Sequence, residues 1–174
     1  MRSLFLSVLL LIGSLSAVAQ KQTDRGYHVK IGDKVPNISL HLTDGTTVTL
    51  NQLRGKVVVL QFTASWCSVC RKEMPHLERE IWQPNKDKNF MLIGVDFDEP
   101  LAKVLAFKKE MKVSYPFALD PKAAIFQQFA NKTSGVTRNV VINQNGTIAF
   151  LTRLYDRAEF EKMKANIQKL LSKQ

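Results

Sequence analysis

The sequence predicts a single α/β domain in which a mixed central sheet is flanked by helices. Three observations predict it: two continuous apolar runs rich in β-branched residues, helical spacing of apolar residues after each run, and two turns that join short extended segments. Strand–helix–strand order favours parallel neighbours, and hairpins add antiparallel ones. At 174 residues, 45% of them apolar, the chain is long enough for one buried core.

The first nineteen residues predict a secretory signal peptide. Arg2 precedes the short apolar run LFLSVLLLIGSL, and Ala17-Val18-Ala19 before Gln20 forms a small-x-small cleavage site. The alternative is a membrane anchor left uncleaved, although a span needs roughly 20 apolar residues. We expect residues 1–19 to be a leader that sends the protein to the periplasm, residues 20–29 a flexible N-terminus, and residues 30–174 the folded domain.

The charge balance is basic and falls from +10 to +9 when the leader and its arginine are removed. A basic balance can indicate nucleic-acid binding. Here the lysines are scattered through helix-like stretches with no aromatic-basic motif, as in Lys108, Lys109, Lys112, Lys162, Lys164 and Lys169. We therefore expect a solvated basic surface and no nucleic-acid partner.

The first elements lie between residues 31 and 82. NISLHL and TTVTL flank Asp44-Gly45 and predict a β-hairpin. GKVVVLQFTA is continuously apolar, which is typical of a strand buried on both faces. From Cys67 to about Trp82 the apolar residues have helical spacing, so a helix is expected to follow that strand.

The same order repeats afterwards. FMLIGVDF, residues 90–97, predicts a second buried strand. Asp98 is expected to cap a helix from Pro100 to Lys112, and Asp120-Pro121 to start another that runs through Ala130.

A hairpin and a helix end the chain. VVIN and TIAFL, joined by Gln144-Asn145-Gly146, predict the hairpin. Asp156, with Glu159 three residues later, predicts the start of the last helix. Its apolar face is packing rather than a cofactor site and consists of Phe160, Met163, Ile167 and Leu170.

The only two cysteines, Cys67 and Cys70, stand three positions apart in SWCSVCR. They could form a redox couple, half of a metal site, or a structural disulfide. A metal site would need two of the three histidines (His28, His41 and His76), which have no paired ligand spacing, so no metal is expected. A disulfide across two residues closes a tiny loop and removes little chain entropy, which leaves the redox couple as the favoured interpretation.

The order strand, cysteine pair, helix has a chemical consequence. It places Cys67 at a helix N-terminus, where unpaired amides and the helix dipole stabilise a thiolate. Cys70 lies one turn further on, within reach but shielded. An outer nucleophile with a resolving thiol behind it is what disulfide exchange requires.

Residues 66–75, WCSVCRKEMP, closely resemble the WCxxC(R/K)xExP signature of TlpA/ResA-type thiol-disulfide oxidoreductases. These are exported members of the thioredoxin superfamily, related to the AhpC/TSA and redoxin proteins. The resemblance covers about residues 30–172 and includes GDKVPNISL, LRGK, YPFALDP and VVINQNGTI. It implies a thioredoxin-like fold with an N-terminal β-hairpin extension and an inserted helix and strand segment.

The resemblance also implies residue roles. Cys67 corresponds to the attacking thiol, Cys70 to the resolving thiol, and Glu73 to an acid that tunes their protonation, which makes these three the catalytic set. The alternative for Glu73 is an ordinary first-turn glutamate favoured by the helix dipole. Trp66 corresponds to an aromatic side chain on the substrate-contact surface. No small-molecule cofactor is implied.

The sequence departs from the family pattern at three places. Ser68-Val69 separates the cysteines, where the family often has proline before the second one. Gln61 replaces the buried aspartate of thioredoxin, so proton transfer would run through Glu73 or water. Thr137 takes the position of a cis-proline that faces the cysteine pair.

The third departure leads to three expectations. Val136 and Thr137 should contact the substrate. The Val136–Thr137 bond should be trans, because cis costs about 2.5–4 kcal/mol at a residue other than proline. The hydroxyl of Thr137 should still lie within hydrogen-bonding reach of Cys67.

These observations together predict an exported oxidoreductase that exchanges electrons with protein disulfides. Reduction is the expected direction, because the families it resembles mostly reduce. An upstream thiol donor, expected in the membrane, would supply the electrons, and we expect a monomer.

Two other functions remain open from the sequence. A peroxiredoxin-type peroxidase needs a proline, a threonine and an arginine at set positions, but Leu60 stands at the proline position, Thr63 lies four residues before Cys67 rather than three, and Arg138 is one position off. A module that keeps the fold and only docks partners is the second alternative.

Overall fold

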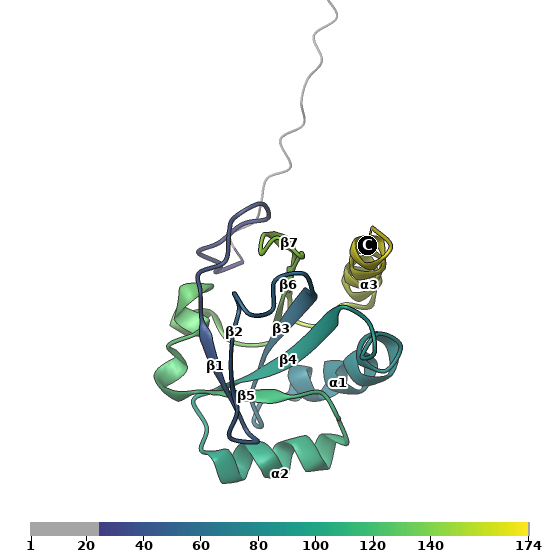
Figure 1. Cartoon of the computed structure of the whole chain (residues 1–174). Coiled ribbons are helices and arrows are strands. Elements are labelled where there is room, and N and C mark those ends of the chain that lie inside the picture. The colour runs from purple at the N-terminus through teal and green to yellow at the C-terminus, as the bar shows by residue number, and fades with distance from the viewer. Residues whose placement is uncertain (1–24, 174) are drawn as a thin grey trace, which may run out of the picture.

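The computed structural model describes residues 25–173 and contains a seven-stranded mixed sheet at its centre (Figure 1). The strands are β1 (Ser39–Leu42), β2 (Thr47–Thr49), β3 (Val57–Thr63), β4 (Phe90–Phe97), β5 (Phe117–Asp120), β6 (Arg138–Ile142) and β7 (Ile148–Arg153). Their order across the sheet is β2-β1-β5-β4-β3-β6-β7. The three central strands β5, β4 and β3 are parallel, and the other pairings are antiparallel. The predicted mixed α/β sheet and both predicted hairpins are confirmed.

Two apolar layers cover the two faces of this sheet. The helices α1 (Ser68–His76), α2 (Leu101–Met111) and α3 (Arg157–Leu171) pack on one face through residues such as Met74, Phe107 and Met163. The chain before β1 and the turns after β5 cover the other face, with Val35 and Phe126 among the buried residues. Every residue of β3 is buried, because this strand lies inside the sheet and is covered on both faces.

The predicted helix from Cys67 to Trp82 is present but changes type halfway. The α-helix ends at His76, and the π-helical turn η1 (Leu77–Trp82) continues it. Pro75 lies inside the helix and has no N–H to donate, which weakens regular α-helical bonding at this point. The wider turn that follows is closed by Gln83 N–H donating to the carbonyl of Glu78.

Two predicted helix starts are wrong. Asp98 does not cap α2; its φ is +59°, and its carboxylate accepts the backbone N–H of Lys122 at 2.6 Å. Residues 121–130 form the short 3₁₀ turns η2 (Pro121–Ala123) and η3 (Phe126–Gln128) instead of one helix. Positive φ at Lys122 and Ala123 interrupts the helix, and the Asp120 carboxylate instead accepts the N–H groups of Ile125 and Phe126.

Residues 25–29, which the sequence assigned to a flexible N-terminus, are packed onto the domain. The Tyr27 hydroxyl donates to the carbonyl of Thr152 at 2.5 Å, and His28 N–H donates to the carbonyl of Phe129 at 2.8 Å. Arg25 forms an ion pair with Glu159. Tertiary contacts therefore order this short segment. The predicted leader and residues 20–24 lie outside the described residues.

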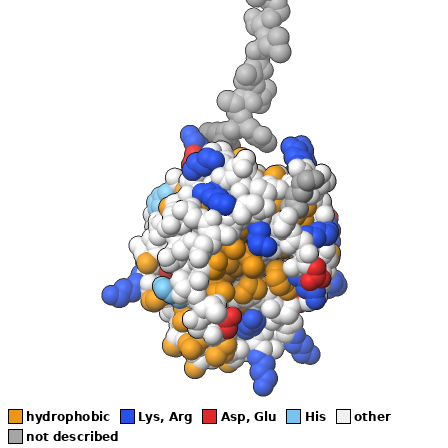
Figure 2. Space-filling view, in the orientation of Figure 1, with side chains coloured by type: hydrophobic (Ala, Val, Ile, Leu, Met, Phe, Trp, Pro, Cys, Tyr) orange, Lys and Arg blue, Asp and Glu red, His pale blue; other side chains and the backbone are white. Residues whose placement is uncertain are grey.

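The full sequence carries a net charge of +10, and the face drawn in Figure 2 shows how its basic side chains are distributed there. Figure 2 shows Lys and Arg side chains spread around one face, with apolar side chains gathered near its middle. No helix within residues 25–173 has both the length and the apolar character needed to cross a bilayer.

Candidate active site

Cys67 and Cys70 form a disulfide at the start of α1, with their Cα atoms 5.3 Å apart. Cys67 is the N-cap residue, and its sulfur accepts the backbone N–H of Cys70 at 3.1 Å. Cys67 is 7% exposed, whereas Cys70 is fully buried. A helix-terminal amide therefore points at the outer sulfur, where it would stabilise the thiolate of the reduced protein.

Thr137 contacts both sulfur atoms. Its hydroxyl oxygen lies 3.2 Å from Cys67 Sγ and 2.9 Å from Cys70 Sγ, so the contact expected from the sequence is present. Disulfide sulfurs carry no hydrogen, so the hydroxyl is the donor in this state.

The expected trans bond is wrong: the Val136–Thr137 peptide is cis. Its surroundings hold this loop from several directions. Besides the sulfur contacts, the carbonyl of Thr137 accepts the N–H of Leu154 at 2.9 Å, and the Arg138 guanidinium donates to the carbonyls of Gly135 and Ser134. Sequence reasoning did not include these partners, which come from the residue directly after β7 and from the turn before the loop.

Glu73 lies on α1 three residues after Cys70 and is buried against the sheet. Asn139 donates to one carboxyl oxygen at 2.7 Å, and Gln61 donates to the other at 3.3 Å. Burial raises the pKa of the Glu73 carboxyl to about 7, although the two amide donors act in the opposite direction. The position is therefore not that of an exposed first-turn glutamate.

The partners of Glu73 belong to a buried polar group. The sequence singled out Gln61 as the replacement for a buried aspartate, but sequence reasoning missed Asn139, Tyr115 and Thr152. Gln61 accepts the hydroxyl proton of Tyr115 at 2.8 Å, and Asn139 Nδ2 donates also to the hydroxyl of Thr152 at 2.9 Å. All of these side chains are buried within the described structure. The available signal was a polar residue inside an otherwise apolar strand, as at Asn139 before VVI.

The loop before Cys67 presents an aromatic side chain to solvent. Trp66 is 60% exposed, and its ring makes an edge contact with Phe97 at 6.4 Å between centroids. Glu99 holds the preceding residue by accepting both the backbone N–H and the hydroxyl of Ser65. Val136, which precedes Thr137, is largely buried. Trp66 and Thr137 therefore approach the disulfide from two different segments.

A second buried carboxyl, Asp96, lies at the end of β4. Burial raises its pKa to about 7, and the nearby Glu99 carboxylate adds to the rise. The register places Asp96 opposite Thr63 of β3, four residues before Cys67. Two acids with raised pKa values thus lie behind the active-site loop and helix.

Thr63 and Arg138, which were compared with the peroxidase pattern, make other contacts. The hydroxyl of Thr63 contacts the sulfur of Met74, and Arg138 is engaged by backbone carbonyls and the Tyr27 ring. Within the described part of the chain, neither side chain hydrogen-bonds to Cys67. Residues 25–173 also hold no group of three or more His, Cys, Asp or Glu side chains that could bind a metal ion.

Comparison with known proteins agrees with this geometry. The Redoxin family model matches residues 30–171. The thiol-disulfide oxidoreductase ResA of Bacillus cereus (strain ATCC 10987 / NRS 248) is 32% identical over 133 residues, which cover 74% of this chain and 75% of the relative.

Two solved structures are also similar. A candidate protein disulfide isomerase from Bacteroides thetaiotaomicron is 55% identical, with a TM-score of 0.82, over 84% of this chain and 93% of that one. The thioredoxin domain of a thiol-disulfide oxidoreductase from Bacteroides vulgatus is 26% identical, with a TM-score of 0.65, over 79% and 98% of the two chains.

The fold, the cysteine pair and the relatives lead to one assignment. A cysteine pair at disulfide distance begins a helix that follows the central strand β3. The matched ResA relative is named a thiol-disulfide oxidoreductase. The chain belongs to the Redoxin family and is a thiol-disulfide oxidoreductase with a thioredoxin-like fold.

Proposed function

We propose that the protein is exported to the periplasm and reduces disulfides in other proteins there. The observation that carries the proposal is the asymmetry of the cysteine pair. Cys67 is 7% exposed and its sulfur accepts the Cys70 N–H, whereas Cys70 has no exposed surface. An incoming disulfide can therefore meet only one of the two sulfurs, which is the order that exchange followed by resolution requires.

The reaction transfers two electrons in two steps. The Cys67 thiolate attacks one sulfur of the substrate disulfide; that S–S bond breaks, a Cys67–substrate bond forms, and the leaving thiolate takes up a proton. Cys70 then loses its proton and attacks Cys67 Sγ, which releases the second substrate thiolate, to be protonated in turn. The protein is left with its Cys67–Cys70 disulfide, and the substrate has gained two electrons and two protons.

Glu73 and Thr137 serve these steps in different ways. Glu73 lies one turn beyond Cys70, and a carboxyl with a pKa of about 7 can accept the Cys70 proton and release it near neutral pH. The hydroxyl of Thr137 lies close enough to both sulfurs to donate to whichever one carries negative charge.

Trp66 and the Val136–Thr137 loop form the substrate-contact surface in this proposal. An exposed tryptophan beside the reactive sulfur supplies apolar contact area for an incoming polypeptide. The loop lies against the disulfide through the Thr137 hydroxyl, which contacts both sulfurs.

Export and the redox partner complete the proposal. Residues 1–19 act as a cleaved leader, and residues 30–174 act as a monomeric domain that is re-reduced by a thiol donor in the membrane. The basis for the leader is its charged start, apolar run and small-x-small site. No nucleic acid takes part.

The direct test is to trap substrates with Cys70→Ser. This variant should hold its substrates as mixed disulfides on Cys67, whereas Cys67→Ser should hold none. The trapped proteins can be identified after release with a reductant. Recovery of the same adducts from both variants would contradict the assigned order of attack.

Two assays separate the alternatives. The reduced protein should reduce insulin much faster than free dithiothreitol does, and a rate no higher than that of dithiothreitol would favour a docking module. Hydroperoxide consumption with a thiol donor should be slow, and rapid consumption would favour a peroxidase.

A further inference from the structure

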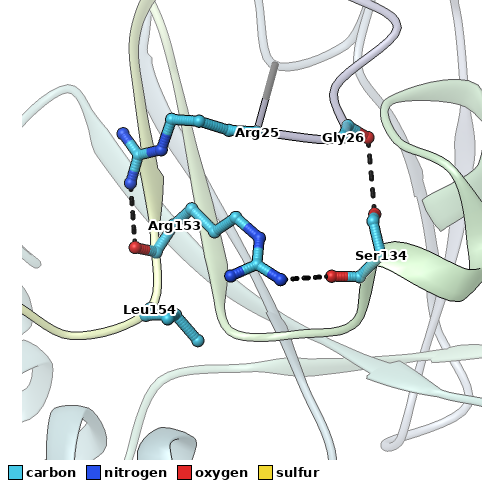
Figure 3. Close-up of a pocket in the computed structure, with 5 residues that line it drawn as sticks. All are labelled: Arg25, Gly26, Ser134, Arg153 and Leu154. Atoms are coloured by element: carbon cyan, nitrogen blue, oxygen red, sulfur yellow. Dashed lines mark hydrogen bonds between the residues drawn. The ribbon is translucent and has the colours of Figure 1, made fainter. Parts of the chain in front are cut away.

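A pocket lined by two arginines opens next to the loop that carries Thr137. Its walls are Arg25, Gly26, Ser134, Arg153 and Leu154, and it encloses about 540 Å³ (Figure 3). Arg153 donates to the carbonyl of Ser134 at 2.7 Å, and Arg25 donates to the carbonyl of Arg153 at 2.8 Å. The two arginine side chains thus join the N-terminal segment, β7 and the turn before β6.

The pocket carries more positive than negative charge. Glu159 neutralises Arg25, with its second oxygen 2.9 Å from Nη2. The backbone N–H of Arg153 donates to Glu159 Oε2 at 3.4 Å, but the Arg153 guanidinium forms no ion pair with a carboxylate of residues 25–173, and neither does that of Arg138. Arg138 is fully buried and donates to the Ser134 hydroxyl at 2.8 Å, while its Nη1 has no partner in the described structure. Within the described residues, the Arg153 guanidinium in the pocket wall and the Arg138 guanidinium bonded to Ser134 therefore have no carboxylate counter-ion.

The pocket lies within a few residues of the disulfide. Ser134 precedes Thr137 by three residues, a distance of at most about 11 Å along an extended chain. Leu154 lies on the other wall, and its N–H donates to the carbonyl of Thr137 itself. Since Thr137 touches both sulfurs, an extended peptide bound at Cys67 could reach the pocket with a residue about three positions away.

The chemistry of the walls selects a carboxylate. Guanidinium groups bind carboxylates through paired, charge-assisted hydrogen bonds, which a backbone carbonyl or an amide cannot match. Leu154 is 43% exposed and adds an apolar surface at the rim for the methylene groups of an acidic side chain. Leu154 has a positive φ of 64°, and its backbone is held by the hydrogen bond to the carbonyl of Thr137.

We propose that this pocket binds an acidic side chain of the substrate polypeptide, a few residues from the cysteine under attack. The proposal rests on the proposed function, because it requires a protein disulfide at Cys67. It makes acidic residues near the disulfide a determinant of substrate choice. The overall basic charge of the chain would also attract acidic peptides, so the test must separate the pocket from the net charge.

The test compares two disulfide-bonded peptides that differ only by Glu or Gln three residues from one cysteine. Pre-reduced protein should reduce the Glu peptide about five- to tenfold faster at low salt, and the ratio should shrink in 0.5 M salt. Arg153→Gln should bring the ratio close to one while the rate for the Gln peptide stays unchanged. Arg153→Lys should keep part of the preference.

Arg79→Gln is the matched control. Arg79 has a side chain that is 64% exposed and lies in η1, so this variant changes the net charge by the same amount away from the pocket. It should keep the wild-type ratio. If both variants lose the preference for the Glu peptide equally, the effect is due to net charge and the proposed role of the pocket is overturned.

Three further outcomes also distinguish the proposed role of the pocket from the proposed function. If wild-type protein reduces both peptides at the same rate, the pocket has no such role and the proposed function stands. If it reduces neither peptide, the proposed function fails. If Arg153→Gln slows both peptides equally, Arg153 only supports the loop, and the proposal is overturned.

Discussion

Glu73 and Glu80 lie two turns apart on the same helical segment, yet their surroundings move their pKa values in opposite directions. Glu73 faces the sheet, where Asn139 and Gln61 are its partners, and burial raises the pKa of its carboxyl to about 7. Glu80 faces α3, and hydrogen bonds from Arg157, His76, Lys164 and Arg79 hold the pKa of its carboxyl well below the usual range.

The difference shows that residue type and helix position do not decide what a carboxyl group can do. Glu73 is surrounded by neutral amides and apolar side chains, so its charge is costly and its proton is exchangeable near pH 7. Glu80 is surrounded by cations, so it stays ionised and ties α3 to the helix before it. One region suits proton transfer, and the other suits structural support.

The largest effect is expected for Glu73→Gln. In the folded protein the Glu73 pKa is raised from about 4.5 to about 7, so its contribution to stability is full below pH 4.5 and is lost as the pH rises to 7. The glutamine at this position cannot ionise. The variant should therefore not show the decrease of about 3 kcal/mol in the free energy of unfolding that the wild type shows as the pH rises. Urea unfolding of the oxidised protein at pH 4.5 and pH 8 measures it. Disulfide exchange should also slow about tenfold, with a changed pH–rate profile.

The contribution of Asp96 to stability changes with pH in the same direction as that of Glu73, so the two effects must be separated. Its pKa is also raised to about 7, and its contribution is present in both wild type and variant. The difference between the two proteins therefore isolates Glu73. Identical pH dependence of stability in wild type and Glu73→Gln would mean that the Glu73 carboxyl is not destabilised by burial.

A smaller effect is expected for Thr137→Val, which tests an uncharged group in the same buried region. The hydroxyl donates toward the sulfurs, so its loss should weaken stabilisation of the Cys67 thiolate. The midpoint of iodoacetamide alkylation against pH should rise by about one unit. Thr137→Ser keeps the hydroxyl and should stay near wild type. A valine variant with an unchanged midpoint would rule out this hydrogen bond in the reduced protein.

The smallest effect is expected for Glu80→Gln. Removing the ion pairs with Arg157 and Lys164 should cost about 1 kcal/mol at pH 7 and leave disulfide exchange unchanged. Because the folded pKa is depressed, this stability is present above pH 4.5 and is lost as the pH falls below it. Urea unfolding at pH 7 and pH 3 checks the direction in which this stability changes with pH, which is opposite to the direction expected for Glu73. A cost that persists at pH 3 would contradict an electrostatic origin.

Local patterns predicted well where the partners are close in the chain. The strands at 57–63 and 90–97, both hairpins and the Asp156 cap follow from neighbouring residues, and the structure has all of them. Two of the errors share a cause: Asp98 and Thr137 are held by groups from other segments, which a pattern of neighbours does not contain. The error after Asp120 is local, because positive φ at Lys122 and Ala123 interrupts the helix.

The sequence by itself determined the strands of the sheet, both hairpins and the position of Cys67 at a helix start, because each depends on residues within a few positions of one another. The tertiary structure decided the cis bond at Thr137, the raised pKa of Glu73 and the arginine pocket. The Glu73 carboxyl meets side chains from positions 61 and 139, and the pocket joins positions 25, 134 and 153. Burial and charge at these places arise only when distant segments pack together, and that packing sets the free energy of each ionised group.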